Sequence, residues 1–97
     1  MKITKKQASI LSKKFSIDHR VIPFNEWHFG LNVELEHGKI LGLTNITDDN
    51  LEKTAKIVLA HIIEYPDYYK YLKKMEEKLH KYWKGKVKPD IFKKIEK

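Results

Sequence analysis

Apolar residues recur with helical spacing through most of the chain. In the first segment Thr4 and Gln7 have the spacing of a capping box, and the stripe that follows consists of Ala8, Leu11 and Phe15. We therefore predict a first helix over about residues 5–14. After a connection over residues 16–22, a second apolar stripe consists of Phe24, Trp27, His28, Leu31 and Leu35.

The second stripe has a start and a stop signal. Pro23 suits the first position of a helix, and Gly38 can adopt the left-handed conformation that ends one. These signals predict a second helix over about residues 23–37. Residues 38–46 hold two glycines and four apolar side chains, so we expect a loop that packs on the core rather than a solvated linker.

Two more helices follow this loop. Thr47 is a candidate N-cap, and Asp48 and Asp49 suit the positive end of the helix dipole. From Ala55 to Tyr65 the segment is nearly all apolar, so we expect this third helix to be the central and most buried one.

Pro66 predicts a bend after the third helix. A fourth helix over about residues 67–84 would turn its apolar stripe inward, namely Tyr68, Leu72, Met75, Leu79 and Tyr82 or Trp83.

These elements predict a single compact all-α domain of four or five short helices, with a packed loop between the second and third. We place the domain at residues 1–85. Residues 86–97 are expected to form a basic extension or one further short helix, because Gly85 and Pro89 interrupt the fourth helix.

Composition supports a folded, soluble and cytoplasmic protein without a membrane segment. Of the 97 residues, 41% are hydrophobic and none is cysteine, which excludes disulfides, thiolate zinc sites and a cysteine nucleophile. Arg20 is the one basic residue that is not lysine. Such a lysine bias is typical of an AT-rich genome, and a bacterium, a phage or a large virus, acting in the host cytoplasm, fits it.

Two polar pairs interrupt the helical pattern. Glu34 and His37 form an E-x-x-H pair on the second predicted helix, and His61 and Glu64 form the reverse pair on the third. Each pair falls to the same side of its apolar stripe, so the four side chains could meet if the helices pack antiparallel. That meeting requires His37 and His61 to lie at one level, which a nine-residue loop allows but does not force.

Such a set has three interpretations. It could be a buried hydrogen-bond network that fixes helix register, with help from Tyr68. It could bind a divalent transition metal such as Fe, Mn, Zn or Ni, with Glu34, His37, His61 and Glu64 as ligands and with Glu36 and Asp67 orienting them. It could also line a pocket for a small molecule or peptide. The chain lacks the common phosphate-binding, dinucleotide-binding, zinc-protease and nucleophilic-serine motifs.

The excess positive charge is confined to the C-terminal quarter. Residues 1–69 balance to zero, whereas residues 70–97 hold eleven lysines against four acidic residues. Aromatic residues alternate with these lysines, so weak, salt-sensitive binding of nucleic acid or another polyanion is one expectation. Its candidate residues are Lys70, Lys73, Lys74, Lys81 and Lys84.

Three blocks of the chain resemble a family of small proteins of unknown function found in bacteria, archaea and viruses. The blocks are residues 29–38 with V-E-L-E-H-G, residues 44–49 with T-N-I-T-D-D, and residues 60–69 with A-H-I-I-E-Y-P-D-Y-Y. The resemblance covers about residues 15–76 and implies a compact helical fold without an assigned activity. The polar residues that match the family pattern are Glu34, Glu36, His37, His61, Glu64, Asp67 and Tyr68.

We therefore expect a non-enzymatic binding or interaction protein, in which the polar residues organise the core or line a pocket. Its partner would be another protein or a second copy of the chain, since so short a chain buries limited area by itself. A metalloprotein is the alternative, and polyanion binding is the second alternative.

Overall fold

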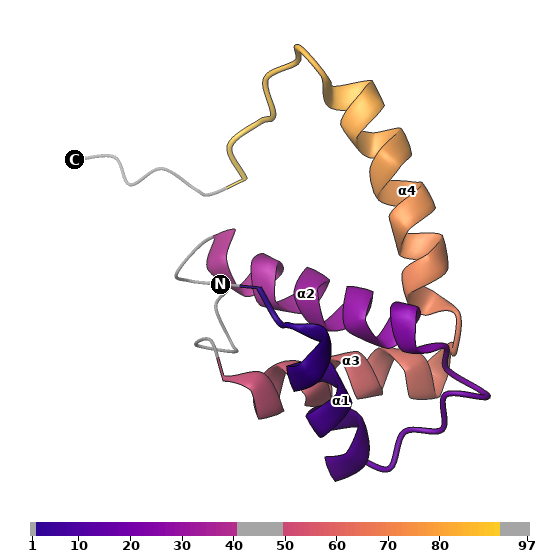
Figure 1. Ribbon diagram of the computed structural model, residues 1–97. Coiled ribbons are helices and arrows are strands. Elements are labelled where there is room, and N and C mark those ends of the chain that lie inside the picture. Colours follow the sequence, from indigo (N-terminus) through magenta and orange to yellow (C-terminus); the bar gives the residue numbers. More distant parts are fainter. Residues whose placement is uncertain (1, 41–49, 92–97) are drawn as a thin grey trace.

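The computed structural model describes residues 2–40 and 50–91, except for the side chains of 38–40. Four helices make up the fold (Figure 1): α1 (Lys5–Lys14), α2 (Phe24–Ile40), α3 (Leu51–Glu64) and α4 (Tyr68–Trp83). No strand occurs in this part of the chain, so the predicted all-α class is confirmed. Within the same ranges, every helix is too short or too polar to cross a membrane.

The N-terminal segment is fixed on α2 by polar contacts of its backbone. Thr4 and Gln7 form the predicted capping box at the start of α1. The backbone N–H of Ile3 donates to Asn32 Oδ1 at 2.8 Å, and its carbonyl oxygen lies 2.6 Å from His28 Nε2. These contacts bring α1 beside α2, where the Trp27 indole donates to the carbonyl of Ala8 at 3.0 Å.

The central helix is α2, which contacts each of the other three helices. Trp27, Leu31 and Leu35 are completely buried along one side of it. The expectation that the third helix would be central is therefore wrong. The side chain of Ile63 on α3 is 78% exposed, because α3 has neighbours on fewer sides than α2.

Two predicted helix caps are wrong, one at the end of α2 and one at the start of α3. The second helix continues through Gly38 to Ile40, since a glycine inside a helix costs only about 1 kcal/mol and does not by itself end the helix. The third helix is capped by Asn50, whose side chain accepts from the backbone N–H of Lys53 at 3.0 Å. The predicted N-cap Thr47 and the predicted packed loop from residue 41 onward lie outside the described residues.

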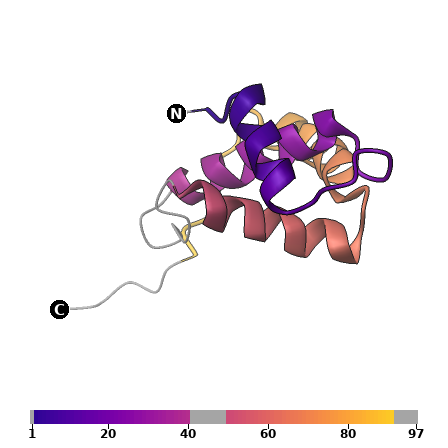
Figure 2. The same ribbon diagram turned by 60° about the horizontal axis from the view of Figure 1, so that its bottom comes forward.

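α2 and α3 run antiparallel, and α4 turns away from them (Figures 1 and 2). The predicted bend at Pro66 separates α3 from α4. One residue of the first turn of α4, Tyr69, is buried, at 1% exposed. The stripe that we predicted to face inward is instead largely exposed, at Met75, Leu79 and Tyr82, because the later turns of α4 extend beyond the other helices.

After α4 the described chain has no further helix up to Ile91, and Gly85 takes a positive φ of 75° directly after it. The predicted terminal helix falls mostly in residues 92–97, which lie outside the described ranges. The domain division at residue 85 stays a prediction.

Candidate functional site: a polar cluster between three helices

A buried carboxylate on α2 lies at the centre of the candidate site. Glu34 is 8% exposed, on the side of α2 that faces α3 and α4. Its Oε1 lies 3.6 Å from Nδ1 of His37, one turn further along α2. Its Oε2 lies 3.4 Å from Nδ1 of His61 on α3. The two carboxylate oxygens therefore face two different histidines.

Tyr69 brings α4 into the same cluster. Its hydroxyl lies 3.0 Å from His61 Nδ1, within hydrogen-bond distance, and close enough to the Glu34 carboxylate to be affected by its charge. The ring packs against α2 at Gly30, where a Cβ atom would lie only 2.8 Å from it. Only glycine leaves room for this approach of α4 to α2 without a shift of the ring. We call Glu34, His37, His61 and Tyr69 the polar cluster.

The electrostatics of the polar cluster keep Tyr69 protonated. Burial raises the pKa of its hydroxyl well above the ordinary value of 10.0, and the negative charge of Glu34 raises it further. The phenol therefore keeps its proton and remains able to donate a hydrogen bond inside the polar cluster. His61 Nδ1 lies 3.0 Å from the Tyr69 hydroxyl and 3.4 Å from Glu34 Oε2, so polar contacts through His61 connect the three side chains inside the fold.

Two contacts close the polar cluster on its outer side. His37 Nε2 lies 3.3 Å from Oε1 of Glu76 on the middle of α4. The ring of Tyr68 stacks on His61, with 4.3 Å between centroids and 10° between planes. Side chains from α2, α3 and α4 are thus held together by polar and ring contacts in addition to apolar packing.

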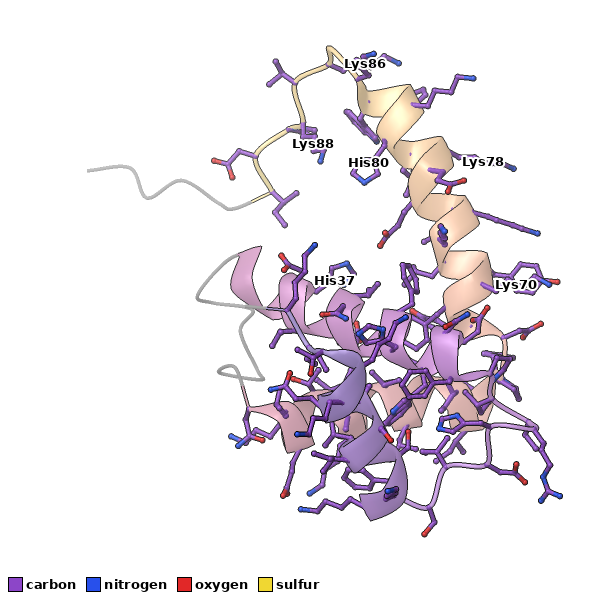
Figure 3. The ribbon with its side chains drawn as sticks, viewed as in Figure 1. His37, Lys70, Lys78, His80, Lys86 and Lys88 are labelled. Atoms are coloured by element: carbon purple, nitrogen blue, oxygen red, sulfur yellow. The ribbon has the colours of Figure 1, made fainter. Side chains whose placement is uncertain are left out.

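The structure brings together only part of the set chosen from the sequence. Glu34, His37, His61 and Tyr68 meet, and in Figure 3 His37 projects from α2 toward the gap below α4. Glu64, Glu36 and Asp67 lie exposed outside the polar cluster.

The axial positions of the helices explain why Glu64 is left out. Because the two helices are antiparallel, the end of α2 and the start of α3 lie at the same end of the pair. His37 lies three residues from that end along α2, whereas His61 lies ten residues from it along α3. At 1.5 Å per residue the two histidines differ in level by roughly 10 Å. Glu34 lies between them and reaches both. Glu64 is one turn further from Glu34 and extends past it.

Tyr69 and Glu76 belong to the arrangement and were not among the candidates. Neither lies on the apolar stripe of α4, which was the pattern used to find inward-facing residues. The available signal for Tyr69 was its aromatic side chain beside Tyr68, in the first turn after Pro66. Its partner Gly30 gave no signal by itself, because a glycine in a helical pattern has many explanations.

The polar cluster does not form a recognisable metal centre. Among the residues with a described position, no group of three or more His, Asp and Glu side chains is arranged to hold an ion. His37 and His61 approach opposite oxygens of Glu34, and the fourth predicted ligand, Glu64, lies elsewhere.

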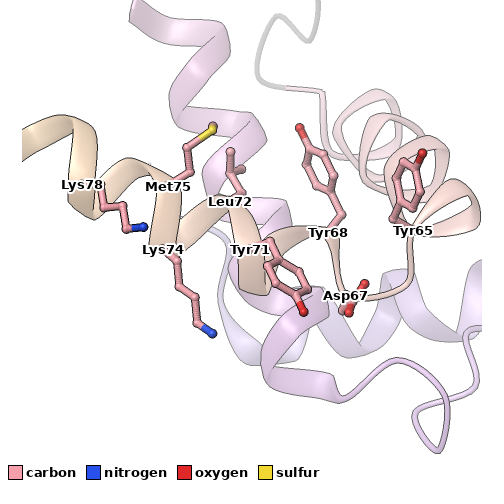
Figure 4. Close-up of a pocket in the computed structure, with 8 residues that line it drawn as sticks. All are labelled: Tyr65, Asp67, Tyr68, Tyr71, Leu72, Lys74, Met75 and Lys78. Carbon is pink, nitrogen blue, oxygen red and sulfur yellow. The ribbon is translucent and has the colours of Figure 1, made fainter.

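Two of the surface cavities along α4 adjoin the polar cluster. One of about 790 Å³ lies where α4 faces the end of α2, and His37, Glu76 and His80 are among its lining residues. The other, of about 740 Å³, lies along the start of α4, and we call it the α4 groove (Figure 4). It is lined by Tyr65, Asp67, Tyr68, Tyr71, Leu72, Lys74, Met75 and Lys78.

The candidate polyanion-binding lysines lie exposed along α4 and directly after it. Figure 3 shows Lys70 and Lys78 pointing outward from the helix. Lys73 lies 5.8 Å from the ring centroid of Phe29, and Lys74 lies 5.5 Å from that of Tyr71, so these two ammonium groups also contact aromatic faces. Lys81 and Lys84 complete the predicted set.

The fold and the polar cluster define a small all-α protein whose second helix is enclosed by the other three. The chain belongs to the family described as Protein of unknown function (DUF5661), whose profile matches residues 3–78. This agrees with the resemblance to a family of unknown function and extends it toward the N-terminus. Neither the curated proteins nor the solved structures gave a match.

Proposed function

We propose that the protein is a non-enzymatic binding protein, in which the polar cluster fixes the position of α4 and the exposed apolar side of α4 binds a partner. One observation carries the proposal. Four large apolar side chains lie on one side of α4 and are between 46% and 60% exposed, namely Tyr71, Met75, Leu79 and Tyr82, whereas the other exposed large apolar residues are spread over different parts of the chain.

The polar cluster itself fits an architectural role better than a catalytic one. A general base needs access to a substrate proton, but the Glu34 side chain is 9% exposed and its two oxygens face His37 and His61 at 3.6 and 3.4 Å. A fully satisfied polar network inside a small core favours one arrangement of the helices. In this protein it joins α4 to α2 and α3.

Metal binding is the second candidate, and the geometry around Glu34 is the observation in its favour. The N···O separations of 3.4 Å and 3.6 Å to His61 and His37 are of the size found between neighbouring ligands of one ion. Against it, the two imidazoles approach different oxygens from different levels. A mononuclear Fe, Mn, Zn or Ni site would require the side chains to rearrange.

The experiment that separates the two proposals combines elemental analysis with thermal unfolding. The protein is purified without a tag or a chelator, and wild type is compared with His61→Ala and His80→Ala. His80 is an exposed histidine on α4, outside the polar cluster, and serves as the matched control. We expect no stoichiometric metal in any of the three proteins.

Under the architectural role His61→Ala lowers the free energy of unfolding by about 1–3 kcal/mol, because Glu34 and Tyr69 lose a buried partner. His80→Ala changes the stability by less than about 0.5 kcal/mol. Near-integral metal in wild type and in His80→Ala, but not in His61→Ala, would contradict the architectural role and support the metalloprotein.

Polyanion binding remains the third candidate, based on the exposed lysines of α4. It requires an affinity for single-stranded nucleic acid that falls steeply with salt and that weakens when residues 86–97 are removed. An affinity that is independent of salt would exclude it.

A further inference from the structure

The α4 groove has the shape and the lining of a helix-binding site. Its floor is apolar and is formed by Tyr65, Tyr68, Tyr71, Leu72 and Met75. Figure 4 shows Met75, Leu72, Tyr68 and Tyr65 in a row that runs from α4 back to the end of α3. Apolar side chains that alternate along a groove are the surface that the apolar face of an amphipathic helix recognises.

The length of the apolar row agrees with this interpretation. From Tyr68 to Met75 the apolar lining of the groove on α4 extends over two turns, or roughly 10 Å at 1.5 Å per residue, and Tyr65 continues it toward the end of α3. A partner helix of three to four turns can lie along it and contribute side chains at positions i, i+3 or i+4, and i+7. Tyr68 is held from behind by its stacking on His61, so the polar cluster supports one wall of the groove.

The positive charges around the groove favour a partner with acidic side chains. Lys74 and Lys78 line the end of the groove that lies further along α4, and Asp67 is the one acidic residue in its lining. Nearly all the other exposed charge on α4 is positive as well, at Lys70, Lys73 and Lys81. A partner with carboxylates flanking its apolar face is attracted to this rim, and a basic partner is repelled.

A second copy of the chain fits this surface less well. Each copy has a formal charge of +7, and its excess is concentrated in the C-terminal quarter that includes α4. Two such surfaces repel when they approach. Nucleic acid also fits less well, because the floor of the groove presents aliphatic side chains at Leu72 and Met75 beside its aromatic rings.

We infer that the α4 groove binds an acidic amphipathic helix of another protein, through apolar contacts on its floor and carboxylate contacts at Lys74 and Lys78. The inference rests on the proposed binding function and specifies the chemical class of the partner.

The test uses three fluorescent synthetic helices of 16 residues and the full-length protein. The first peptide has leucine at the apolar positions and glutamate on both flanks. The second replaces each glutamate with lysine, and the third keeps the glutamates but replaces each leucine with alanine. We expect fluorescence anisotropy to show binding of the first peptide at least tenfold tighter than that of either control peptide.

Variants locate the binding to the groove. Met75→Asp, at a half-exposed position, and the double variant Lys74→Glu/Lys78→Glu should each weaken binding of the first peptide at least tenfold. Val87→Asp is the matched control, because Val87 is 94% exposed and outside the groove, and it should leave the affinity unchanged. Circular dichroism of each variant confirms that the helices are retained.

Three outcomes would overturn the inference. Equal binding of the two glutamate peptides would show that the surface recognises negative charge alone, as a polyanion site does. Sedimentation of the wild type as a dimer, with a monomer for Met75→Asp, would assign the groove to a second copy. Binding of the first peptide that Met75→Asp leaves unchanged would place its site elsewhere. None of these results depends on the metal content, so they are distinguishable from failure of the architectural role of the polar cluster.

Discussion

α2 and α4 have similar lengths, but α2 buries its large apolar side chains and α4 leaves most of its own exposed. α2 completely buries Trp27, Leu31 and Leu35, although it also carries Glu34 into the interior. α4 separates its apolar and charged residues more cleanly, yet Met75 and Leu79 remain about half exposed. The comparison shows that an amphipathic stripe identifies the side of a helix that favours burial, while the arrangement of the other elements decides whether it is buried.

The difference begins at the turn before α4. The turn at Pro66 redirects the chain, so α4 packs on the core mainly through its first turns, where Tyr69 is buried and Leu72 is partly buried. Further along α4, its contacts with α2 include the ion pair of Glu76 with His37 and the Lys73 ammonium group over the Phe29 ring. α2 therefore contributes most of the buried apolar side chains of the two helices, and α4 leaves much of its apolar side exposed.

The same substitution on the two helices should give the largest difference. Leu31→Ala removes a fully buried side chain and is expected to lower the free energy of unfolding by about 2–5 kcal/mol. Leu79→Ala removes a side chain that is 46% exposed and should cost less than about 1 kcal/mol. Urea unfolding followed by circular dichroism measures both values.

Equal losses for the two variants would contradict the comparison. They would mean that the apolar side of α4 is covered in solution, either by another copy or by a segment of the chain itself. Repeating the Leu79→Ala measurement over a range of protein concentrations separates these two cases, since only self-association depends on concentration.

The sequence predicted the helices well because their signals are local. The capping box at Thr4 and the turn at Pro66 act within a few residues, and both occur as predicted. The predicted inward side of α4 is confirmed at Tyr68 and Leu72 but is wrong at Met75, Leu79 and Tyr82, because periodicity cannot show that a helix extends beyond its neighbours. The burial of Tyr69 depends on a glycine that is distant in sequence, Gly30, and no local pattern indicates such a contact.

A second prediction tests the closest approach of α4 to α2. Gly30→Ala should destabilise the protein by about 1–3 kcal/mol, because the added Cβ would lie 2.8 Å from the Tyr69 ring. At an exposed helical position the same change from glycine would stabilise by about 1 kcal/mol. The sign of the change in unfolding free energy therefore reports whether the two helices touch.

A double-mutant cycle provides the control for this contact. With Tyr69→Ala in the background, Gly30→Ala should lose its cost, which gives a coupling energy of at least about 0.5 kcal/mol. Asn25→Ala, at an exposed position on α2, should change the stability by less than about 0.5 kcal/mol. Stabilisation by Gly30→Ala in wild type would show that α4 does not pack at this point.

The sequence could predict the contacts of the polar cluster that lie within one helix, but not those between helices. Glu34 and His37 are linked by helical spacing, which the sequence shows directly. The pairing of Glu34 with His61 depends on the relative level of α2 and α3, and that level is set by where each helix ends. The sequence predicted α2 to end too early and α3 to begin too early, so the levels, and with them the role of Glu64, could not be derived.

The smallest effect concerns the hydroxyl of Tyr69 and its dependence on pH. Tyr69→Phe removes the hydroxyl that hydrogen-bonds His61 Nδ1 and should cost about 1 kcal/mol near neutral pH. In the folded protein, burial raises the pKa of this hydroxyl above 10.0, whereas in the unfolded chain the group ionises near its ordinary value. Above about pH 10 the unfolded state therefore binds fewer protons than the folded state, and the contribution of Tyr69 to stability falls as the pH rises.

The stability difference between wild type and Tyr69→Phe should accordingly shrink, by up to roughly 1.4 kcal/mol per pH unit above pH 10. Lysine ionisation affects both proteins alike and cancels in this difference. Tyr71→Phe, which removes an exposed hydroxyl from the same helix, should follow the wild-type curve. Parallel curves for wild type and Tyr69→Phe would show that Tyr69 ionises equally easily in both states. The first turn of α4 would then be as open to solvent as its last turns, and the contrast with α2 would extend to the whole helix.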